Sequence, residues 1–233
     1  MFVLAWEIAG RTAHNRLLPP FSAVFRVMLD EAASGRLGHH LGITLVRVAW
    51  AFAIAMALGT VLGVAMGRSP AIDRLFDSPV TLLLNLPALV GIVLIFVWFG
   101  LSEATTIAAV ALNKFPATAV TLREGARVVE GRLLDMARSF GLSHRATWRH
   151  VIVPQLSPYV FAAARAGFAL IWKIVLVAEL LGRSDGVGFQ IQVYFQLFDV
   201  TSILAYTLAF MAVVQAIEWG VLQPIERRVN RWR

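Results

Sequence analysis

Five long apolar segments limit what this chain can fold into more than any other feature of its sequence. The hydrocarbon core of a bilayer is roughly 30 Å thick, and a helix needs about 20 apolar residues to cross it. We therefore expect an all-α, polytopic membrane protein with five full transmembrane helices. The segments are Gly42–Met66, Val80–Phe99, Ala104–Leu122, Tyr159–Leu181 and Thr201–Leu222.

The composition agrees with this class and argues against others. Hydrophobic residues make up 58% of the 233 residues and charged residues 15%, against roughly 45–50% and about 25% in soluble domains. A disordered chain and an ordinary soluble enzyme fit these values poorly. The chain has no cysteine, which excludes disulfides, thiolate metal sites and thiol nucleophiles. In a membrane protein, the net charge of +7 indicates basic cytoplasmic loops rather than nucleic-acid binding.

Residues 1–41 are expected to form an N-terminal unit ahead of a transmembrane domain at 42–233. The first ten residues, MFVLAWEIAG, are too few to span a bilayer alone and predict a short helix. After Pro19 and Pro20, the stretch FSAVFRVMLDEAA has the apolar spacing of a helix. We interpret it as an amphipathic helix on the membrane surface, and a packed connector without a special role fits the pattern equally well.

The distribution of basic residues predicts the orientation in the membrane. Twelve of the 21 basic residues follow the first, third and fifth segments, whereas five lie on the other side. Basic residues concentrate on the cytoplasmic side of a membrane, so the side with twelve, which includes the C-terminus, is predicted to be cytoplasmic. The twelve are Arg68, Arg74, Arg123, Arg127, Arg132, Arg138, Arg145, Arg149, Arg227, Arg228, Arg231 and Arg233.

The largest loop on that side, residues 123–157, is a cytoplasmic insertion that is too polar to span a membrane. Val128–Phe140 repeats its apolar residues at three- and four-residue steps, as a helix does. Gly141 stands where a helix ends in the left-handed conformation that glycine tolerates. Ser143 is placed to cap a second helix, His144–Val151. An exposed apolar stripe on such a helix–turn–helix indicates a docking surface.

Glycines and prolines predict how the helices pack and where they break. Asn85 and Pro87 suggest a local break in the second apolar segment, with freed backbone groups facing a cavity. Pro154 and Pro158 are expected to close the insertion before the fourth segment. A helix face of small residues predicts ordinary close packing in the first segment; these residues are Gly59, Gly63 and Gly67.

The insertion resembles the EAA loop of bacterial ABC-importer permeases. Asp135-Met136-Ala137, three residues, Gly141, and later Ile152-Val153-Pro154 follow the order of that loop, which typically reads E-A-A, three residues, G, and then I-x-L-P. Asp, Met and Val at positions 135, 136 and 153 depart from the usual residues. In that family the loop inserts into a groove of the ATPase subunit. The coupling residues implied are Asp135, Met136, Ala137, Arg138, Ser139, Phe140, Gly141, Leu142 and Ser143.

The resemblance extends over most of the chain and narrows to the sulfonate/taurine/nitrate-type permeases. Val93 and Val120 depart from residues common in that branch, and the full additional N-terminal span of most members is missing or shortened. The ordered set of short motifs carries the likeness more than any one of them. The set is Thr44-Leu45-x-Arg47, Trp98-Phe99-Gly100, Phe115-Pro116, Gly125, Arg127-Val128, Arg165, Trp172, Val177-Ala178-Glu179 and Ser184-Asp185-Gly186-Val187-Gly188.

The resemblance implies a type I, MetI-like permease fold within an importer built from several chains. The implied partners are two copies of an ABC ATPase, a second copy of this permease in a homodimer, an extracytoplasmic solute-binding protein and the lipid bilayer, with no nucleic acid. The implied location is the bacterial cytoplasmic (inner) membrane. The branch carries small anions such as sulfonates, taurine and nitrate, but also neutral or cationic vitamin precursors. Lys114, Lys173 and Arg165 favour an anion.

The motifs of an enzyme are missing from this sequence. A P-loop needs G-K-[ST], but the two lysines follow Asn113 and Trp172. We expect no catalytic residue, metal site or bound cofactor on this subunit, with ATP and Mg used by the partner ATPase. Two other functions stay open: a secondary transporter or channel that works without an ATPase, and a membrane-embedded enzyme.

Six residues within the spans are candidates for the translocation path. A charge in the hydrocarbon costs about 2.5–3.5 kcal/mol on insertion scales, so it usually faces a pore, a partner or the bundle interior. Arg165, Trp172 and Glu179 are spaced by seven, which places them on one helix face. Instead of lining a path, the charges on that face could form a network between subunits or within the helix that does not contact the solute. For Lys114 the alternatives are a helix–helix salt bridge or a side chain that snorkels toward the membrane surface. The candidates are Asn113, Lys114, Arg165, Trp172, Lys173 and Glu179.

Overall fold

The computed structural model describes residues 2–12, 17–129 and 131–224, and every regular element in those ranges is a helix. The expected all-α class is therefore confirmed. The α-helices are α1 (Phe2–Thr12), α2 (Phe21–Ala33), α3 (Arg36–Arg68), α4 (Pro70–Asn85), α5 (Ala88–Phe99), α6 (Glu103–Arg127), α7 (Gly131–Ser139), α8 (His144–Thr147), α9 (Val153–Gly182), α10 (Val187–Gln196) and α11 (Val200–Ile217). Two π-helical segments, η1 (Trp148–Ile152) and η2 (Glu218–Leu222), adjoin α9 and α11.

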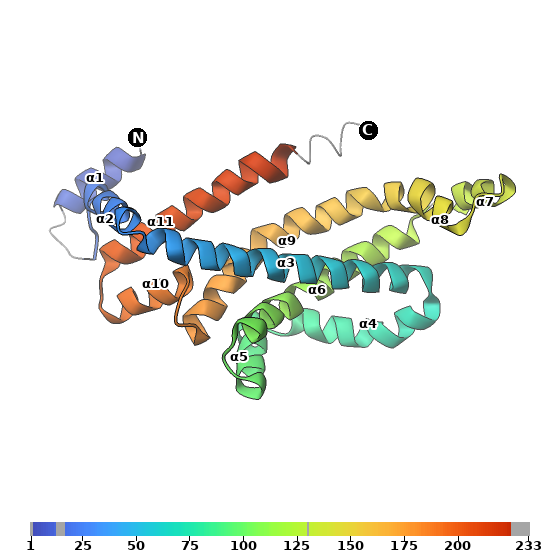
Figure 1. Cartoon of the computed structure of the whole chain (residues 1–233), viewed down its shortest axis with the longest axis horizontal. Coiled ribbons are helices and arrows are strands. Elements are labelled where there is room, and N and C mark those ends of the chain that lie inside the picture. Colours follow the sequence, from blue (N-terminus) through green and yellow to red (C-terminus); the bar gives the residue numbers. More distant parts are fainter. Residues whose placement is uncertain (1, 13–16, 130, 225–233) are drawn as a thin grey trace.

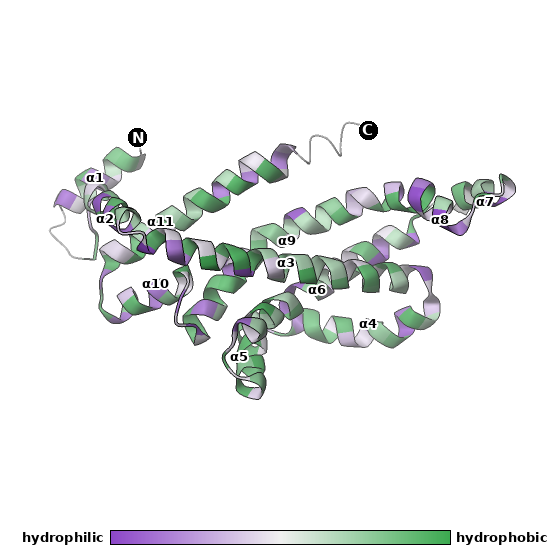
Figure 2. Cartoon of the chain, viewed as in Figure 1, coloured by the Kyte–Doolittle hydropathy of each residue, from purple (hydrophilic) through white to green (hydrophobic). Residues whose placement is uncertain are grey.

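The long helices run along one axis, most of the short helices lie at its two ends, and the short helix α5 lies across the axis beside the middle of the molecule (Figure 1). Helix α3 extends through the middle of the molecule, with α6 and α9 packed along it (Figure 1). Helices α1, α2 and α10 lie at one end, and α7 and α8 lie at the other (Figure 1). Figure 2 shows apolar residues along the length of α3, α9 and α11, with polar residues more frequent toward the ends. The molecule thus has an apolar middle between two more polar poles.

Three described helical stretches are long and apolar enough to cross a membrane by length and composition, namely Arg36–Arg68, His144–Gly182 and Val200–Val221. A fourth is added when α4 and α5 are counted as one span. The third predicted segment, Ala104–Leu122, lies within α6. The count of five spans stays a prediction.

The second predicted segment is not one continuous helix. Helices α4 and α5 meet at an angle of 102°, with Leu86 and Pro87 between them. Proline supplies no backbone N–H and disfavours helical geometry in the residue before it, so the helix ends at Asn85. The break suggested by Asn85 and Pro87 is confirmed, and the predicted segment Val80–Phe99 is divided between α4 and α5.

The glycine face of α3 packs directly on α6. A Cβ on Gly59 would lie 2.5 Å from the Thr118 Cβ, and one on Gly67 would lie 2.5 Å from the Arg123 carbonyl oxygen. At Gly63, the Cβ would collide with the Ala119 carbonyl oxygen. The helices approach this closely because no side chain stands between them, which confirms the predicted packing role.

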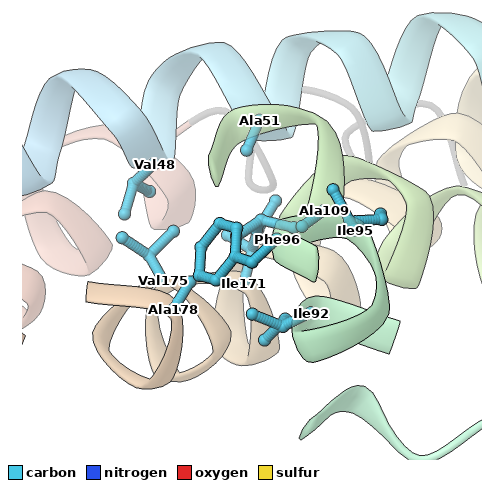
Figure 3. Close-up of a cluster of buried hydrophobic side chains, with 10 residues drawn as sticks. Val48, Ala51, Ile92, Ile95, Phe96, Ala109, Ile171, Val175 and Ala178 are labelled. Carbon is cyan, nitrogen blue, oxygen red and sulfur yellow. The ribbon is translucent and has the colours of Figure 1, made fainter. Parts of the chain in front are cut away.

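One buried cluster ties four helices together around the perpendicular helix α5 (Figure 3). Phe96 of α5 points into the same space as the aliphatic side chains of α9 and α3 (Figure 3). Burying this apolar surface stabilises the junction. The cluster consists of Val48, Ala51, Ile92, Ile95, Phe96, Ala109, Val110, Ile171, Val175 and Ala178.

The N-terminal helices form where they were expected. Helix α1 covers most of the predicted short helix, and α2 matches the stretch FSAVFRVMLDEAA. Helix α2 packs against α11, where Tyr206 donates a hydrogen bond to Glu31 at 2.8 Å. Phe25 and Leu29 remain exposed. Helix α2 is thus a packed connector on one face, and its position at a membrane surface stays a prediction. The boundary placed at residue 41 falls inside α3.

Candidate functional site

The predicted helix–turn–helix of the insertion is present and stands at one pole of the molecule (Figure 1). We name residues 131–147, covering α7 and α8, the α7–α8 elbow. Gly141 has φ +66°, and Leu142 N–H donates to the Ala137 carbonyl at 2.9 Å. The Ser143 hydroxyl accepts from the Ala146 N–H at 3.3 Å. The glycine turn and the serine cap are confirmed, although the first helix starts at Gly131 and not at Val128.

The elbow presents apolar side chains outward without covering them. Phe140 is 78% exposed, and Met136 and Leu142 are also exposed. Ala137, in contrast, is fully buried. Asp135 pairs with Arg138 at 3.2 Å on the surface, and exposed pairs of this kind contribute little stability. The energy of folding therefore does not explain why these apolar residues are on the surface.

The insertion continues into α9 without a break, contrary to the expectation that Pro154 and Pro158 would close it. Residues His144–Gly182 form one continuous helical stretch of 39 residues that includes η1. Pro154 lies inside this stretch, just after the π-helical turn η1, and π-helical turns are one of the irregularities found where a helix accommodates a proline or a kink. Pro158 frees the carbonyl of Pro154, and the Ser157 hydroxyl donates to that carbonyl at 2.9 Å.

The six candidates for the translocation path occupy different environments. Lys114 is only 5% exposed, whereas Arg165 and Lys173 are exposed and Asn113 is half-buried. Trp172 borders a cavity of about 350 Å³ between α3, α9 and α11, and the Lys173 Nζ lies 5.4 Å from the centroid of its ring. Glu179 is fully buried. The seven-residue spacing therefore does not give Arg165, Trp172 and Glu179 a common environment.

Glu179 belongs to a group of charges that we name the Arg47 cluster: Arg47, Glu103, Glu179, Arg183 and Asp185. Arg47 Nη1 donates to Glu179 at 2.7 Å, and Nε and Nη2 donate to the two carboxylate oxygens of Glu103 at 2.8 and 2.5 Å. Arg47 also pairs with Asp185, and Arg183 pairs with Glu103. Three carboxylates and two guanidinium groups thus join α3, α6, α9 and the loop before α10.

Backbone and hydroxyl groups complete the environment of Glu179. The Thr44 hydroxyl donates to its carboxylate at 2.9 Å and accepts from the Val187 N–H. The Gly188 N–H donates to it at 2.9 Å. Gly186, at φ +98°, leaves no room for a side chain beside this carboxylate. A buried carboxylate with this many donors is a structural anchor for the loop that starts α10.

The motifs in the sequence do not by themselves predict the Arg47 cluster. Thr44, Arg47, Glu179, Asp185 and Gly186 belong to three separate motifs of the sequence, and the structure brings these motifs together. Their sequence spacing gave no sign of contact, because Arg47 and Glu179 are 132 residues apart. A search for charge balance among the buried segments would have paired them, since an isolated charge in the hydrocarbon is costly.

Acid is expected to weaken the Arg47 cluster. A hydrogen bond from Arg47 holds the pKa of the Glu103 carboxyl below its ordinary value. Burial raises the pKa of Asp185, but the hydrogen bond and charge of Arg47 outweigh it, so that this pKa also lies below its ordinary value. The resulting stability is complete above the unfolded pKa values of about 4 and is lost as the pH falls through the folded ones. Melting curves should be flat near neutral pH and fall in acid, with a shallower fall in Glu103→Gln. An equal fall in that variant contradicts the assignment.

The sequence matches a family model described as the binding-protein-dependent transport system inner membrane component, over residues 40–221. The putative aliphatic sulfonates transport permease protein SsuC of Escherichia coli (strain K12) is 31% identical over 99% of this chain and 88% of its own length. The taurine transport system permease protein TauC of the same strain is 28% identical, over 97% of this chain and 84% of its own length.

The fold is also similar to solved structures of transporters. A chain of the MetNI methionine ABC transporter in an inward-facing conformation superposes with a TM-score of 0.66 at 17% identity, covering 84% of this chain and 95% of that chain. A chain of an amino acid ABC transporter gives 0.67 at 20% identity with the same coverage. At these identities the likeness concerns the fold, which is the MetI-like arrangement expected from the sequence.

Proposed function

The chain belongs to the family of binding-protein-dependent transport system inner membrane components, which are permeases of ABC transporters, and from this premise we propose how it works. It is the subunit that forms the path for a small solute through the bacterial cytoplasmic membrane, with its C-terminus in the cytoplasm. A separate ATPase supplies the energy. The observation that carries this proposal is the α7–α8 elbow, an exposed apolar turn at one pole of the molecule.

The elbow is the docking point for the ATPase. Its exposed apolar residues, Met136, Phe140 and Leu142, offer a surface that only a partner would cover. Gly141 fixes the direction of the turn, and Asp135 and Arg138 frame it. The remaining predicted coupling residues are Ala137, which accepts a hydrogen bond from Leu142, Ser143, which caps α8, and Ser139, the last residue of α7.

Two copies of the permease meet around one pathway, and each receives one ATPase on its elbow. An extracytoplasmic binding protein delivers the solute at the opposite pole, where α1, α2 and α10 lie (Figure 1). The fold shared with the MetNI transporter supports this plan. The basic residues on the elbow side support its cytoplasmic position, although the arginines at 227, 228, 231 and 233 lie outside the described residues.

Asn113, Lys114, Arg165, Trp172 and Lys173 border the pathway in this proposal. They lie on α6 and α9, two helices that pack on each other and on α3. Glu179, the sixth candidate, acts at the edge of the pathway by holding α9 in the Arg47 cluster. The solute is a small anion of the sulfonate, taurine or nitrate type, in keeping with the relatives named for sulfonates and taurine.

Removing the apolar tip of the elbow is expected to separate the ATPase from the permease. Phe140→Ser deletes the most exposed apolar side chain of the elbow and should reduce co-purification of the partner ATPase by tenfold or more, with loss of ATP-driven uptake. Membrane insertion and the amount of permease should not change, because the side chain contributes no internal packing. The measurement is the ratio of ATPase to permease after affinity purification.

Phe198→Ser is the matched control, because Phe198 is 79% exposed but lies in the turn between α10 and α11 at the opposite pole. This variant should retain the ATPase. Equal ATPase recovery from both variants would remove the docking assignment. Full uptake without any P-loop partner would instead establish an ATPase-independent transporter.

A further inference from the structure

Lys114 is a buried cation for which the described part of the chain supplies no counter-charge. The residue is 5% exposed and lies within the third apolar segment of α6. Among the described residues, no hydrogen bond or ion pair reaches its ammonium group. Arg47, the other deeply buried cation, has three carboxylate partners. The two cations therefore have different roles.

The Lys114 side chain fits into its position because the facing residue of α9 is a glycine and has no side chain. Gly167 of α9 faces it, and a Cβ on this glycine would lie 2.6 Å from the Lys114 Cε. Phe52 of α3 closes the same space, with its ring edge 3.4 Å from that Cβ position. A glycine and a phenylalanine ring offer the ammonium group no negative charge. The position is thus built to hold the stem of a lysine and to leave its charge unpaired.

The ammonium group still reaches accessible space. Among the described residues, one side-chain polar atom, Arg183 Nε, is both fully covered and without a hydrogen-bond partner. The Lys114 Nζ also has no partner but does not meet both conditions, so it must keep some exposed surface. Phe52 also lines the cavity of about 350 Å³ that Trp172 borders. Lys114 itself does not line this cavity, but Phe52 is common to the cavity and to the position beside Lys114. The cavity has room for a small solute beside the aromatic pair Phe52 and Phe168, whose ring centroids are 6.2 Å apart.

We propose that Lys114 is the residue that selects the charge of the transported solute, by pairing with a small mono-anion as the solute passes. The inference rests on the proposed function and deepens it by assigning the selection to one side chain. A single ammonium group compensates one negative charge in apolar surroundings, whereas a dianion would keep an uncompensated charge. Arg165 and Lys173 are exposed, so salt screens their charges and their attraction for a passing anion is weak.

The test uses the fact that the chain contains two lysines, Lys114 and Lys173. Full-length permease labelled with ε-¹³C lysine, in lipid nanodiscs, should give two lysine signals, and Lys173→Arg assigns them. Methanesulfonate should shift the Lys114 signal saturably and leave Lys173 nearly unchanged. Dimethyl sulfone, its neutral analogue, should produce no saturable shift, and sulfate should bind at least tenfold more weakly.

The variant Lys114→Met removes the charge and keeps an unbranched side chain that is one atom shorter. Its apparent affinity for methanesulfonate, measured by isothermal titration on the same nanodiscs, should fall at least tenfold, and Lys114→Arg should stay within about threefold. An absent or equal Lys114 shift with both neutral and anionic probes, or unchanged affinity in Lys114→Met, would overturn the inference. If Lys114→Met does not fold, the labelled wild-type protein still decides. These results leave the docking of the ATPase on the elbow unaffected, so the two proposals fail separately.

Discussion

Arg47→Met is expected to destabilise the protein by about 3–5 kcal/mol, the usual cost of removing one partner from a buried ion pair. The Arg47 and Glu179 side chains are 2% and 0% exposed, so that Glu179 would be left as an uncompensated charge. Glu103 and Asp185 would lose their shared partner as well. The fraction of folded protein and the unfolding midpoint in detergent measure the effect.

Two further variants make this result specific. Arg47→Met combined with Glu179→Gln should recover about 0.5–3 kcal/mol relative to Arg47→Met alone, because the orphaned charge is gone. Arg138→Met breaks a pair whose side chains are 81% and 73% exposed, and it should cost less than about 1 kcal/mol. Equal losses in Arg47→Met and Arg138→Met would show that the cluster does not hold the helices together.

Gly63→Ala is expected to destabilise the protein by about 1–3 kcal/mol or more, although alanine favours a helix. The added Cβ would lie 2.9 Å from the Leu122 Cβ and closer still to the Ala119 carbonyl oxygen. The obstructing atom is backbone, so the strain cannot be relieved by a rotamer change, and α3 and α6 must move apart. Thermal unfolding measured with the purified variant reports this change.

Gly38→Ala is a control on the same helix with the opposite sign. No atom lies within 4 Å of a Cβ at that position, so the substitution removes the entropy cost of glycine in a helix and should stabilise by about 0.5–1 kcal/mol. A stabilising effect of Gly63→Ala would contradict the close packing of α3 on α6.

The sequence predicted the elements whose cause is local. Apolar length located α3, α9 and α11, because crossing a bilayer demands it, and Gly141 and Ser143 marked the turn and cap of the elbow because each acts within a few residues. Proline was a weaker guide. Pro87 breaks a helix, whereas Pro158 does not, because the hydroxyl of Ser157 satisfies the carbonyl that Pro158 frees. That compensation depends on a neighbouring side chain, and the presence of proline does not reveal it.

The long-range features required coordinates. Lys114 was a candidate from its place in an apolar segment, but its lack of a counter-charge depends on what α3 and α9 bring to it. Glu179 was assigned to a helix face by spacing, and its partner Arg47 comes from a helix 132 residues earlier. The short helix α10 was missed altogether, because Val187–Gln196 is too short and too mixed in polarity to stand out from a loop.

The unbroken helix from His144 to Gly182 has a mechanical consequence. Its 39 residues extend over about 58 Å at roughly 1.5 Å per residue, with the elbow at one tip and the Arg47 cluster at the other. No loop intervenes to absorb motion, so a tilt imposed on the elbow arrives at the far tip as a displacement of opposite direction. Helix α9 packs on α6 and α3 between these two tips, so a rigid tilt about that contact would move the elbow and the Arg47 cluster in opposite directions.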